Sequence, residues 1–256
     1  MGHPPPPDWT KPAATHKVSA MLSGLNELLA ATVLFVGAHF LLSSVQLRGS
    51  LVQRIGENRF RGLYSLVVGV SFVWMVFAYG AAPFVELWPA SAPLRWVPLI
   101  AMPFAFVLAV AGLTTRSPTL AGFEAAAGDE LNPAPGILRV TRHPFLWGAA
   151  LWAASHLIAN GDAASAVMTG GILVLSLGGM WHIDQRREAS LGAAWGPVKL
   201  TTSAIPFAAL IAGRTEMDWA GLGWWRPLLG LLLFAVVLGA HSVIFGVSPL
   251  PLELMH

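Results

Sequence analysis

Residues 141–162 read TRHPFLWGAALWAASHLIANGD, an apolar stretch with polar residues at both ends. Residues 144–160 contain no Asp, Glu, Lys or Arg. A run of this kind, close to 20 residues long, crosses the hydrocarbon core of a membrane as a helix. A second apolar run, residues 164–183, follows after a very short turn around Gly161 and Asp162. The sequence therefore predicts a tight antiparallel pair of membrane helices here.

The whole chain has the composition of a membrane protein. Of its 256 residues, 55% are hydrophobic and only 11% are charged, whereas a soluble domain carries about 25% charged residues. Apolar spans are expected at residues 27–47, 63–83, 94–115, 144–160, 164–183 and 227–246. We predict an all-α, polytopic integral membrane bundle with about six transmembrane helices. It forms one domain, residues 23–256, behind a flexible Pro-rich tail, residues 1–22. The absence of cysteine excludes disulfides and thiolate metal sites.

The basic residues give an expected orientation. All of the 15 Lys and Arg residues except Lys11, Lys17 and Arg95 lie in the connections between spans one and two, three and four, or five and six. Because Lys and Arg collect on the cytoplasmic side, both termini are predicted on the opposite side of the inner (cytoplasmic) membrane. Membrane lipid is an expected partner, and this charge distribution does not indicate nucleic-acid binding.

Three histidines, His39, His156 and His241, fall in the interior of predicted spans, whereas His182 lies at the very end of the span 164–183. An ionisable residue at such depth usually has a partner and a function. Two neutral imidazoles that face each other from different helices can bind the two axial positions of a haem iron. The simpler interpretation is a hydrogen bond to a carbonyl or hydroxyl of a neighbouring helix. From the residues alone, both interpretations stay open.

The stretch that begins at residue 141 also carries a family resemblance. Residues 141–188, from TRHPF to DQRRE, resemble the central block of the NnrU family. FVGAHFLLSSVQLRGSLVQRIGENRFRGLYSLV (35–67), TSAIPFAALIAGR (202–214) and FGVSPLPL (245–252) are similar to its other blocks, in the same order. The family includes plant ζ-carotene isomerases, which bind haem b in the membrane and isomerise a carotenoid double bond when the iron is reduced. Its bacterial members are associated with nitric oxide metabolism and denitrification.

The resemblance implies specific residues. The haem ligands of the isomerases fall on His39 and His156, which makes these two the expected metal ligands, and His241 becomes a reserve ligand or a polar neighbour. The isomerases have cysteine at the position of Ala153, so a ligand exchange that uses thiolate is not available here. The expected partners are a hydrophobic or gaseous small molecule and a redox protein.

Two other functions compete with this one. RHP at residues 142–144 and EASLGAAWG at residues 188–196 are similar to the S-adenosylmethionine-binding motifs of isoprenylcysteine and phospholipid methyltransferases. That similarity makes Arg142 and His143 candidate cofactor-binding residues, together with Glu188. The third possibility is a non-enzymatic membrane component that assists the assembly of a partner complex.

Overall fold

The computed structural model describes residues 12–120, 122–128 and 132–251. Within these ranges the chain is helical, and the extended pairing is a single isolated bridge between Glu86 and Asp162. The all-α prediction is confirmed.

Six helices are long. They are α1 (Pro12–Ser43), α3 (Glu57–Ala81), α4 (Ala92–Thr114), α5 (Pro144–Asn160), α6 (Ala163–Leu191) and α10 (Trp225–Phe245). The connections contain the shorter helices α2 (Val45–Ile55), η1 (Glu124–Gly128), η2 (Gly136–Arg139), η3 (Gly192–Ala194), α7 (Trp195–Thr201), α8 (Ala208–Ile211) and α9 (Trp219–Leu222). Each predicted span falls mainly on one of the six long helices.

Five stretches, in α1, α3, α4, the α6–α7 region and α10, are long and apolar enough to cross a membrane. The sixth predicted span, α5, has 17 residues, at the lower end of the usual range. It packs between α4 and α6 along their length. The chain is therefore a multi-pass membrane protein.

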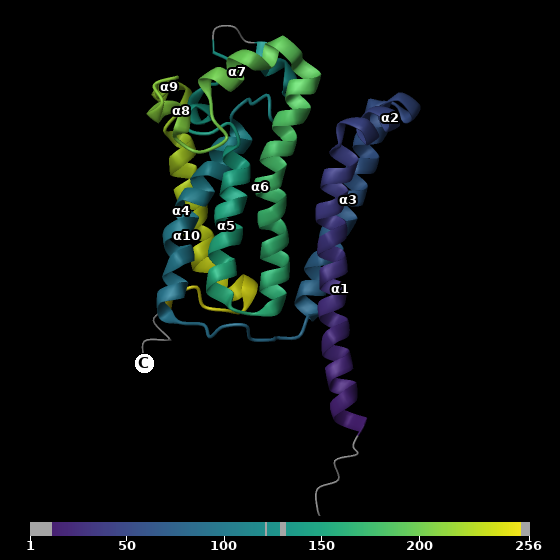
Figure 1. Ribbon diagram of the computed structural model, residues 1–256. Helices are drawn as coiled ribbons and strands as arrows, with labels where there is room; N and C mark the ends of the chain where they lie inside the picture. Colours follow the sequence, from purple (N-terminus) through teal and green to yellow (C-terminus); the bar gives the residue numbers. More distant parts are fainter. Residues whose placement is uncertain (1–11, 121, 129–131, 252–256) are drawn as a thin grey trace, which may run out of the picture.

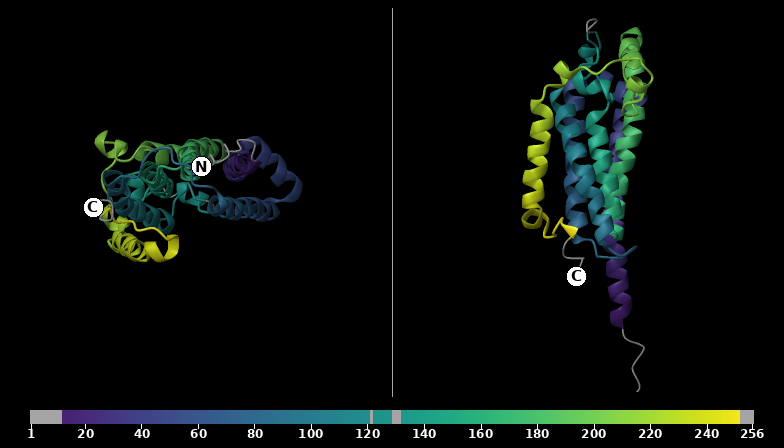
Figure 2. Two further views of the ribbon diagram at one scale, coloured as in Figure 1. Left: turned by 90° about the horizontal axis from the view of Figure 1, so that it is seen from below. Right: turned by 90° about the vertical axis from the view of Figure 1, so that its left-hand side faces the viewer.

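The long helices form a row. In Figure 1 and in the left view of Figure 2, α6 lies between α5 on one side and α1 on the other. The order of packing is α10, α4, α5, α6, α1, α3, with extensive contact between each pair of neighbours. The α1–α3 pair is thus joined to the remaining bundle mainly through α6.

Small residues allow this close packing, as is common between membrane helices. A side chain at Gly148 of α5 would place its Cβ 2.7 Å from the backbone oxygen of Ala105 in α4. A side chain at Gly230 of α10 would meet the opposite side of α4, with its Cβ 2.7 Å from the Cα of Val107. On α6, Gly178 receives the ring of Phe40 from α1. These contacts fix the level of each helix against its neighbour.

The turn between α5 and α6 needs its glycine. Gly161 has φ +71°, and a Cβ there would collide with the backbone oxygen of Trp88. The Asp162 carboxylate accepts a hydrogen bond from the backbone N–H of Ser165 at 2.9 Å and so caps α6. The predicted tight hairpin is confirmed.

Two boundaries differ from the sequence prediction. Span one ends at Ser43 rather than at residue 47, and a separate helix, α2, begins at Val45. The predicted tail, residues 1–22, is helical from Pro12 onward, and residues 1–11 lie outside the described residues. An apolar chain continues a helix readily, and Pro12 occupies the first position, where proline is tolerated.

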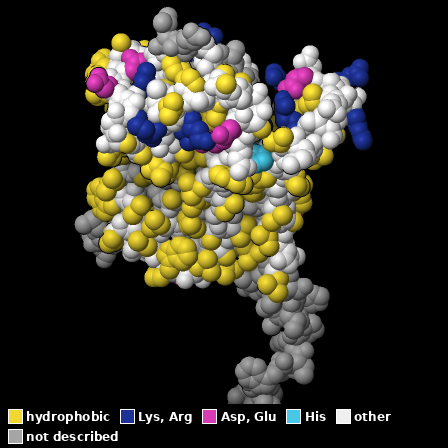
Figure 3. All heavy atoms as spheres, turned by 45° about the horizontal axis from the view of Figure 1, so that its top comes forward, with side chains coloured by type: hydrophobic (Ala, Val, Ile, Leu, Met, Phe, Trp, Pro, Cys, Tyr) yellow, Lys and Arg dark blue, Asp and Glu magenta, His cyan; other side chains and the backbone are white. Residues whose placement is uncertain are grey.

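The surface has two zones. Figure 3 shows a broad apolar belt and, above it, Lys and Arg side chains together with Asp and Glu. We call the end formed by residues 44–61, 115–120, 122–128, 132–143 and 184–226 the arginine-rich end. It contains the connections in which the sequence analysis placed the basic residues. The orientation of this end across the membrane stays a prediction.

Candidate functional site

The three histidines within the spans share one arrangement. The Nδ1 of His39 lies 2.8 Å from the backbone oxygen of Phe35, and that of His156 lies 2.8 Å from the backbone oxygen of Trp152. The Nδ1 of His241 lies 2.9 Å from the backbone oxygen of Val247. A carbonyl only accepts, so each Nδ1 is the protonated donor, and in the neutral ring the lone pair then lies on Nε2. This is the tautomer in which a histidine binds a metal through Nε2.

His39 lies near the arginine-rich end of α1. Its ring contacts Phe35 edge-on at 4.6 Å and Tyr64 of α3 at 5.9 Å. The next residue, Phe40, contacts the ring of His182 on α6 at 5.8 Å. His39 is therefore part of the junction between α1, α3 and α6.

His156 lies toward the other end of the bundle. It is the thirteenth residue of α5, which starts at the arginine-rich end. Its ring packs against Trp152 with 5.1 Å between ring centroids. His241 lies on α10, and α5 and α10 pack on opposite sides of α4.

The structure does not bring His39 and His156 together. Phe40 packs on Gly178 of α6, and Leu146 of α5 lies 3.8 Å from the position of a Cβ at Gly179. Because α5 and α6 are antiparallel, the level of His156 along α6 is roughly eight residues away from the level of His39. At 1.5 Å per residue, the two histidines therefore differ in depth by about 12 Å. Helix α6 also separates the two host helices, and each helix-to-helix spacing is about 8–10 Å.

These positions allow the fit of a haem to be judged. The donor chemistry fits, because each imidazole donates its Nδ1–H to a carbonyl and, within the described part of the chain, its Nε2 has no hydrogen-bond partner. The placement of the predicted pair does not fit, since one iron would have to be reached by His39 and His156 across α6. In the described ranges, no group of three or more His, Asp or Glu residues is placed to hold a metal ion. Histidine ligation stays a prediction.

The RHP motif is placed at the arginine-rich end, where α5 begins. His143 Nε2 lies 2.8 Å from Oδ1 of Asp184 on α6, and the Arg142 guanidinium lies 2.8 Å from Oδ2 of the same carboxylate. The side chains of Arg142, His143 and Asp184 are 11%, 1% and 19% exposed. We call these three residues the Asp184 cluster. It ties the start of α5 to α6, and its ionic groups already satisfy one another.

Asp184 is the residue that the sequence analysis missed as the partner of the motif. It lies one turn before Glu188 in a sequence region where charges return after an apolar run. An acidic residue that is so close to the end of a membrane span is a signal that could have been used. Its partner could not be identified, because Arg142 and Asp184 are 42 positions apart.

Glu188, the third residue that the similarity to methyltransferases singled out, is on the surface. Glu188 pairs with Lys199 of α7 at 2.9 Å, and both side chains are more than half exposed. Arg142 and His143 are bound to Asp184 instead, so these three residues do not converge on one place. Binding of S-adenosylmethionine by them stays an untested prediction from the sequence.

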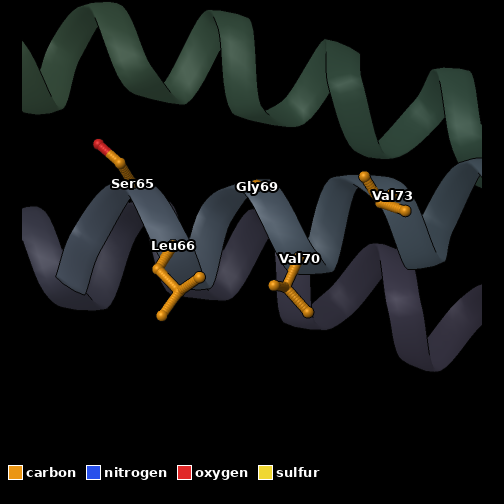
Figure 4. A pocket seen from close by; sticks show the side chains of 5 residues that line it. All are labelled: Ser65, Leu66, Gly69, Val70 and Val73. Carbon is orange, nitrogen blue, oxygen red and sulfur yellow. The ribbon is translucent and has the colours of Figure 1, made fainter. Parts of the chain in front are cut away.

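An apolar groove runs along the outer face of α3. It has a volume of about 320 Å³ and is lined by Ser65, Leu66, Gly69, Val70 and Val73 (Figure 4). A Cβ at Gly69 would meet no atom within 4 Å, so the missing side chain leaves the space open. The groove lies in a membrane-spanning helix and starts one residue after Tyr64, the neighbour of His39.

A second polar network lies in the connections at the arginine-rich end. The Asp218 carboxylate caps α9 by accepting from the backbone N–H of Gly221 at 2.8 Å, and it accepts from the backbone N–H of Gly136 at 2.9 Å. These hydrogen bonds, the one from Gly221 first, lower the pKa of Asp218 below its ordinary value. The network joins the connection before α5 to the connection before α10.

This network predicts a pH dependence. A carboxyl whose pKa is lower in the folded chain stabilises the fold above its unfolded pKa of about 3.9, and this contribution is lost as the pH falls through the folded value. We therefore expect the melting temperature of the wild-type protein to fall more steeply than that of Asp218→Asn between about pH 5 and the lower folded pKa of Asp218. Thermal unfolding in detergent at a series of pH values measures the difference. If the melting temperatures of the two proteins change in parallel with pH, Asp218 does not contribute to the pH dependence of stability.

Fold and site together define a class: a multi-pass helical membrane protein with unbonded imidazoles inside its spans. A family model described as NnrU protein matches residues 27–249. Because this match covers most of the chain, the protein belongs to the NnrU family. The resemblance found in the sequence blocks is thereby confirmed.

Two curated relatives are similar to shorter parts of the chain. The 15-cis-zeta-carotene isomerase of Zea mays chloroplasts is 35% identical over 82 residues, which are 32% of this chain and 22% of that protein. The chloroplast isomerase of the same name from Arabidopsis thaliana is 32% identical over 116 residues, which are 44% of this chain and 32% of that protein. The matched regions thus span at most a third of either relative. No solved structure matches significantly. These similarities support an isomerase-like or NnrU-type function.

Proposed function

We propose that this chain is a haem-dependent membrane isomerase that acts on a hydrophobic polyene. The observation that carries the proposal is the state of the histidines in the spans, whose Nδ1 atoms are bound to carbonyls and whose Nε2 atoms are unbonded. The similarity to two 15-cis-zeta-carotene isomerases supports the choice of reaction.

The apolar surroundings support a hydrophobic substrate. A polyene is as apolar as lipid and would reach the protein through the membrane, where the exposed faces of the spans are almost entirely hydrophobic. The groove on α3 shows that this surface contains an open apolar recess without charged groups.

The proposed role of this chain's residues is to bind and orient. His156 would bind the iron of haem b through Nε2, and the carbonyl of Trp152 would keep its ring in the required tautomer. When bound, haem supplies a redox-active iron in an apolar medium. The surrounding helices would exclude water, which keeps the electrostatic interactions of the site strong.

The experiment is an isomerisation assay with purified protein. The protein, supplied with haem b in detergent, is incubated with a ζ-carotene that contains a 15-cis bond, under oxidising or reducing conditions. The isomers are then separated by liquid chromatography. We expect conversion under reducing conditions and a decrease in His156→Ala that is at least as large as the roughly 10- to 100-fold cost of losing an outer-shell partner of a metal ligand.

A matched control is His182→Ala, which removes an imidazole at the other end of the bundle, on α6. We expect it to keep the wild-type rate. If the haem-loaded wild-type protein leaves the polyene unchanged in both redox states, the proposed function is wrong.

A further inference from the structure

We infer that the outer face of α3 binds an anionic phospholipid, with the phosphate headgroup at Arg59 and Arg54 and an acyl chain in the groove at Gly69. This lipid site does not depend on the isomerase activity proposed above. It combines two features of one helix face, an excess of positive charge and an open apolar groove.

The corner between α2 and α3 is strongly basic. Helix α2 and the first two turns of α3 contain four arginines and one acidic residue, Glu57, which gives a net charge of +3. Glu57 is already bound by two of the arginines, Arg48 at 2.6 Å and Arg61 at 2.8 Å. Arg54 and Arg59 are exposed and have no ion-pair partner within the described residues. Two positive charges at this corner are therefore available to an external anion.

Arg59 lies above an apolar face of α3. Leu63, Leu66 and Val70 follow Arg59 at the spacing i+4, i+7 and i+11, so all four residues lie on one side of the helix. The three apolar side chains are exposed. The predicted span begins at residue 63, which places Arg59 about 6 Å outside the hydrocarbon core. The headgroup layer is about 5–8 Å thick on each side of the core, so Arg59 lies at the level of lipid phosphates.

The groove on the same face offers a place for an acyl chain. It has a volume of about 320 Å³, and its lining from Ser65 to Val73 contains no charged residue. Figure 4 shows Leu66 and Val70 projecting from the same side of α3, with Gly69 between them. The groove starts about 9 Å below Arg59, six residues along the helix. One phospholipid can therefore contact the arginine with its headgroup and the groove with its chain.

The combination favours a phospholipid over other ligands. A free phosphate ion would use the arginines but not the groove. A neutral lipid would use the groove but not the arginines. An acidic protein would approach the arginines from the aqueous side and would leave the groove empty, since the groove lies within a membrane-spanning stretch. An anionic headgroup that is joined to an apolar chain matches both features.

The first experiment measures the preference for an anionic headgroup. The delipidated full-length protein in detergent is titrated with dioleoylphosphatidylglycerol or with dioleoylphosphatidylcholine, and native mass spectrometry counts the bound lipids. The two lipids have the same chains and differ in the charge of the headgroup. We expect the wild-type protein to bind phosphatidylglycerol more tightly than phosphatidylcholine.

The double variant Arg54→Gln, Arg59→Gln should lose this preference. Its affinity for phosphatidylglycerol should fall about fivefold for each arginine removed, or about 25-fold in total, which is the usual contribution of a basic residue near an anionic membrane surface. Arg95→Gln is the matched control, because it removes a positive charge from the start of α4, at the other end of the bundle. It should bind both lipids as the wild-type protein does.

The second experiment fills the groove. Gly69→Leu should lose the tight binding of phosphatidylglycerol, because the new side chain occupies the space of the acyl chain. Thermal unfolding without added lipid should be unchanged, since a Cβ at Gly69 would meet no atom within 4 Å. Gly80→Leu is the control on the same helix, where a Cβ would also meet no atom within 4 Å. This variant should bind phosphatidylglycerol with the wild-type affinity.

Two results would overturn the inference. Equal affinity of the wild-type protein for the two lipids would show that the arginines do not select an anionic headgroup and would leave them to a different partner, such as an acidic protein. If folded Gly69→Leu binds phosphatidylglycerol as tightly as the wild-type protein, no acyl chain occupies the groove. Neither result depends on isomerase activity, so the lipid site and the proposed function can fail separately.

Discussion

Asp184→Asn is expected to destabilise the protein by about 3–5 kcal/mol, the usual cost of removing one partner from a buried ion pair. The carboxylate of Asp184 is bound by the Arg142 guanidinium and by the ring of His143, both at 2.8 Å. The amide of asparagine has no charge and cannot serve both donors in the same way. Arg142 would stay in a largely buried place without a counter-ion.

The measurement is thermal unfolding in detergent, followed by the fluorescence of the tryptophans. The matched control is Glu188→Gln, which also removes one acidic partner from α6. The Glu188–Lys199 pair is more than half exposed at both side chains, and such pairs contribute about 0–1 kcal/mol. Equal decreases in the melting temperature of the two variants would show that the Asp184 cluster contributes no more to the stability of the fold than the exposed Glu188–Lys199 pair.

Gly230→Leu is expected to separate α10 from α4, with a cost at or above the roughly 1–3 kcal/mol of an overpacked core. A Cβ at this position would lie 2.7 Å from the Cα and 2.9 Å from the backbone nitrogen of Val107. Backbone atoms cannot rotate away as the end of a side chain can, so the whole helix must move.

The control for this variant lies on the same helix. A Cβ at Gly239 would meet no atom within 4 Å, and the residue is exposed. Gly239→Leu should therefore leave the unfolding temperature almost unchanged, and the two variants have the same change in hydrophobicity. If Gly230→Leu unfolds at the wild-type temperature, the close contact between α10 and α4 does not exist in the membrane protein.

The Asp184 cluster also changes how the RHP motif is interpreted. Arg142 and His143 were candidates for cofactor binding on the basis of sequence similarity. In the structure, both side chains bind one carboxylate at the boundary between α5 and α6. A buried arginine needs such a partner, since the transfer of an unpaired charge from water costs several kcal/mol. The motif therefore has a structural role that does not need a cofactor.

The candidate histidines could be located in the sequence, but their spatial arrangement could not. His39 and His156 are found by their position in apolar runs and by the blocks that resemble the NnrU family. Whether two imidazoles face each other depends on the lateral order of helices, and α6 lies between α1 and α5. Depth alone was misleading, because the end of α1 at Ser43 places His39 closer to the arginine-rich end than the expected span did.

The sequence by itself determined the membrane class, the helical content, the spans and the hairpin at Gly161. These properties are local, since the length of an apolar run and the conformation of a glycine turn depend on residues that are neighbours in the chain. Only the tertiary structure decided that Asp184 is the partner of Arg142 and His143, and that α6 lies between the helices of His39 and His156. Residues 142 and 184 are brought together by the packing of α5 against α6, and the hydropathy of the sequence carries no information about that packing.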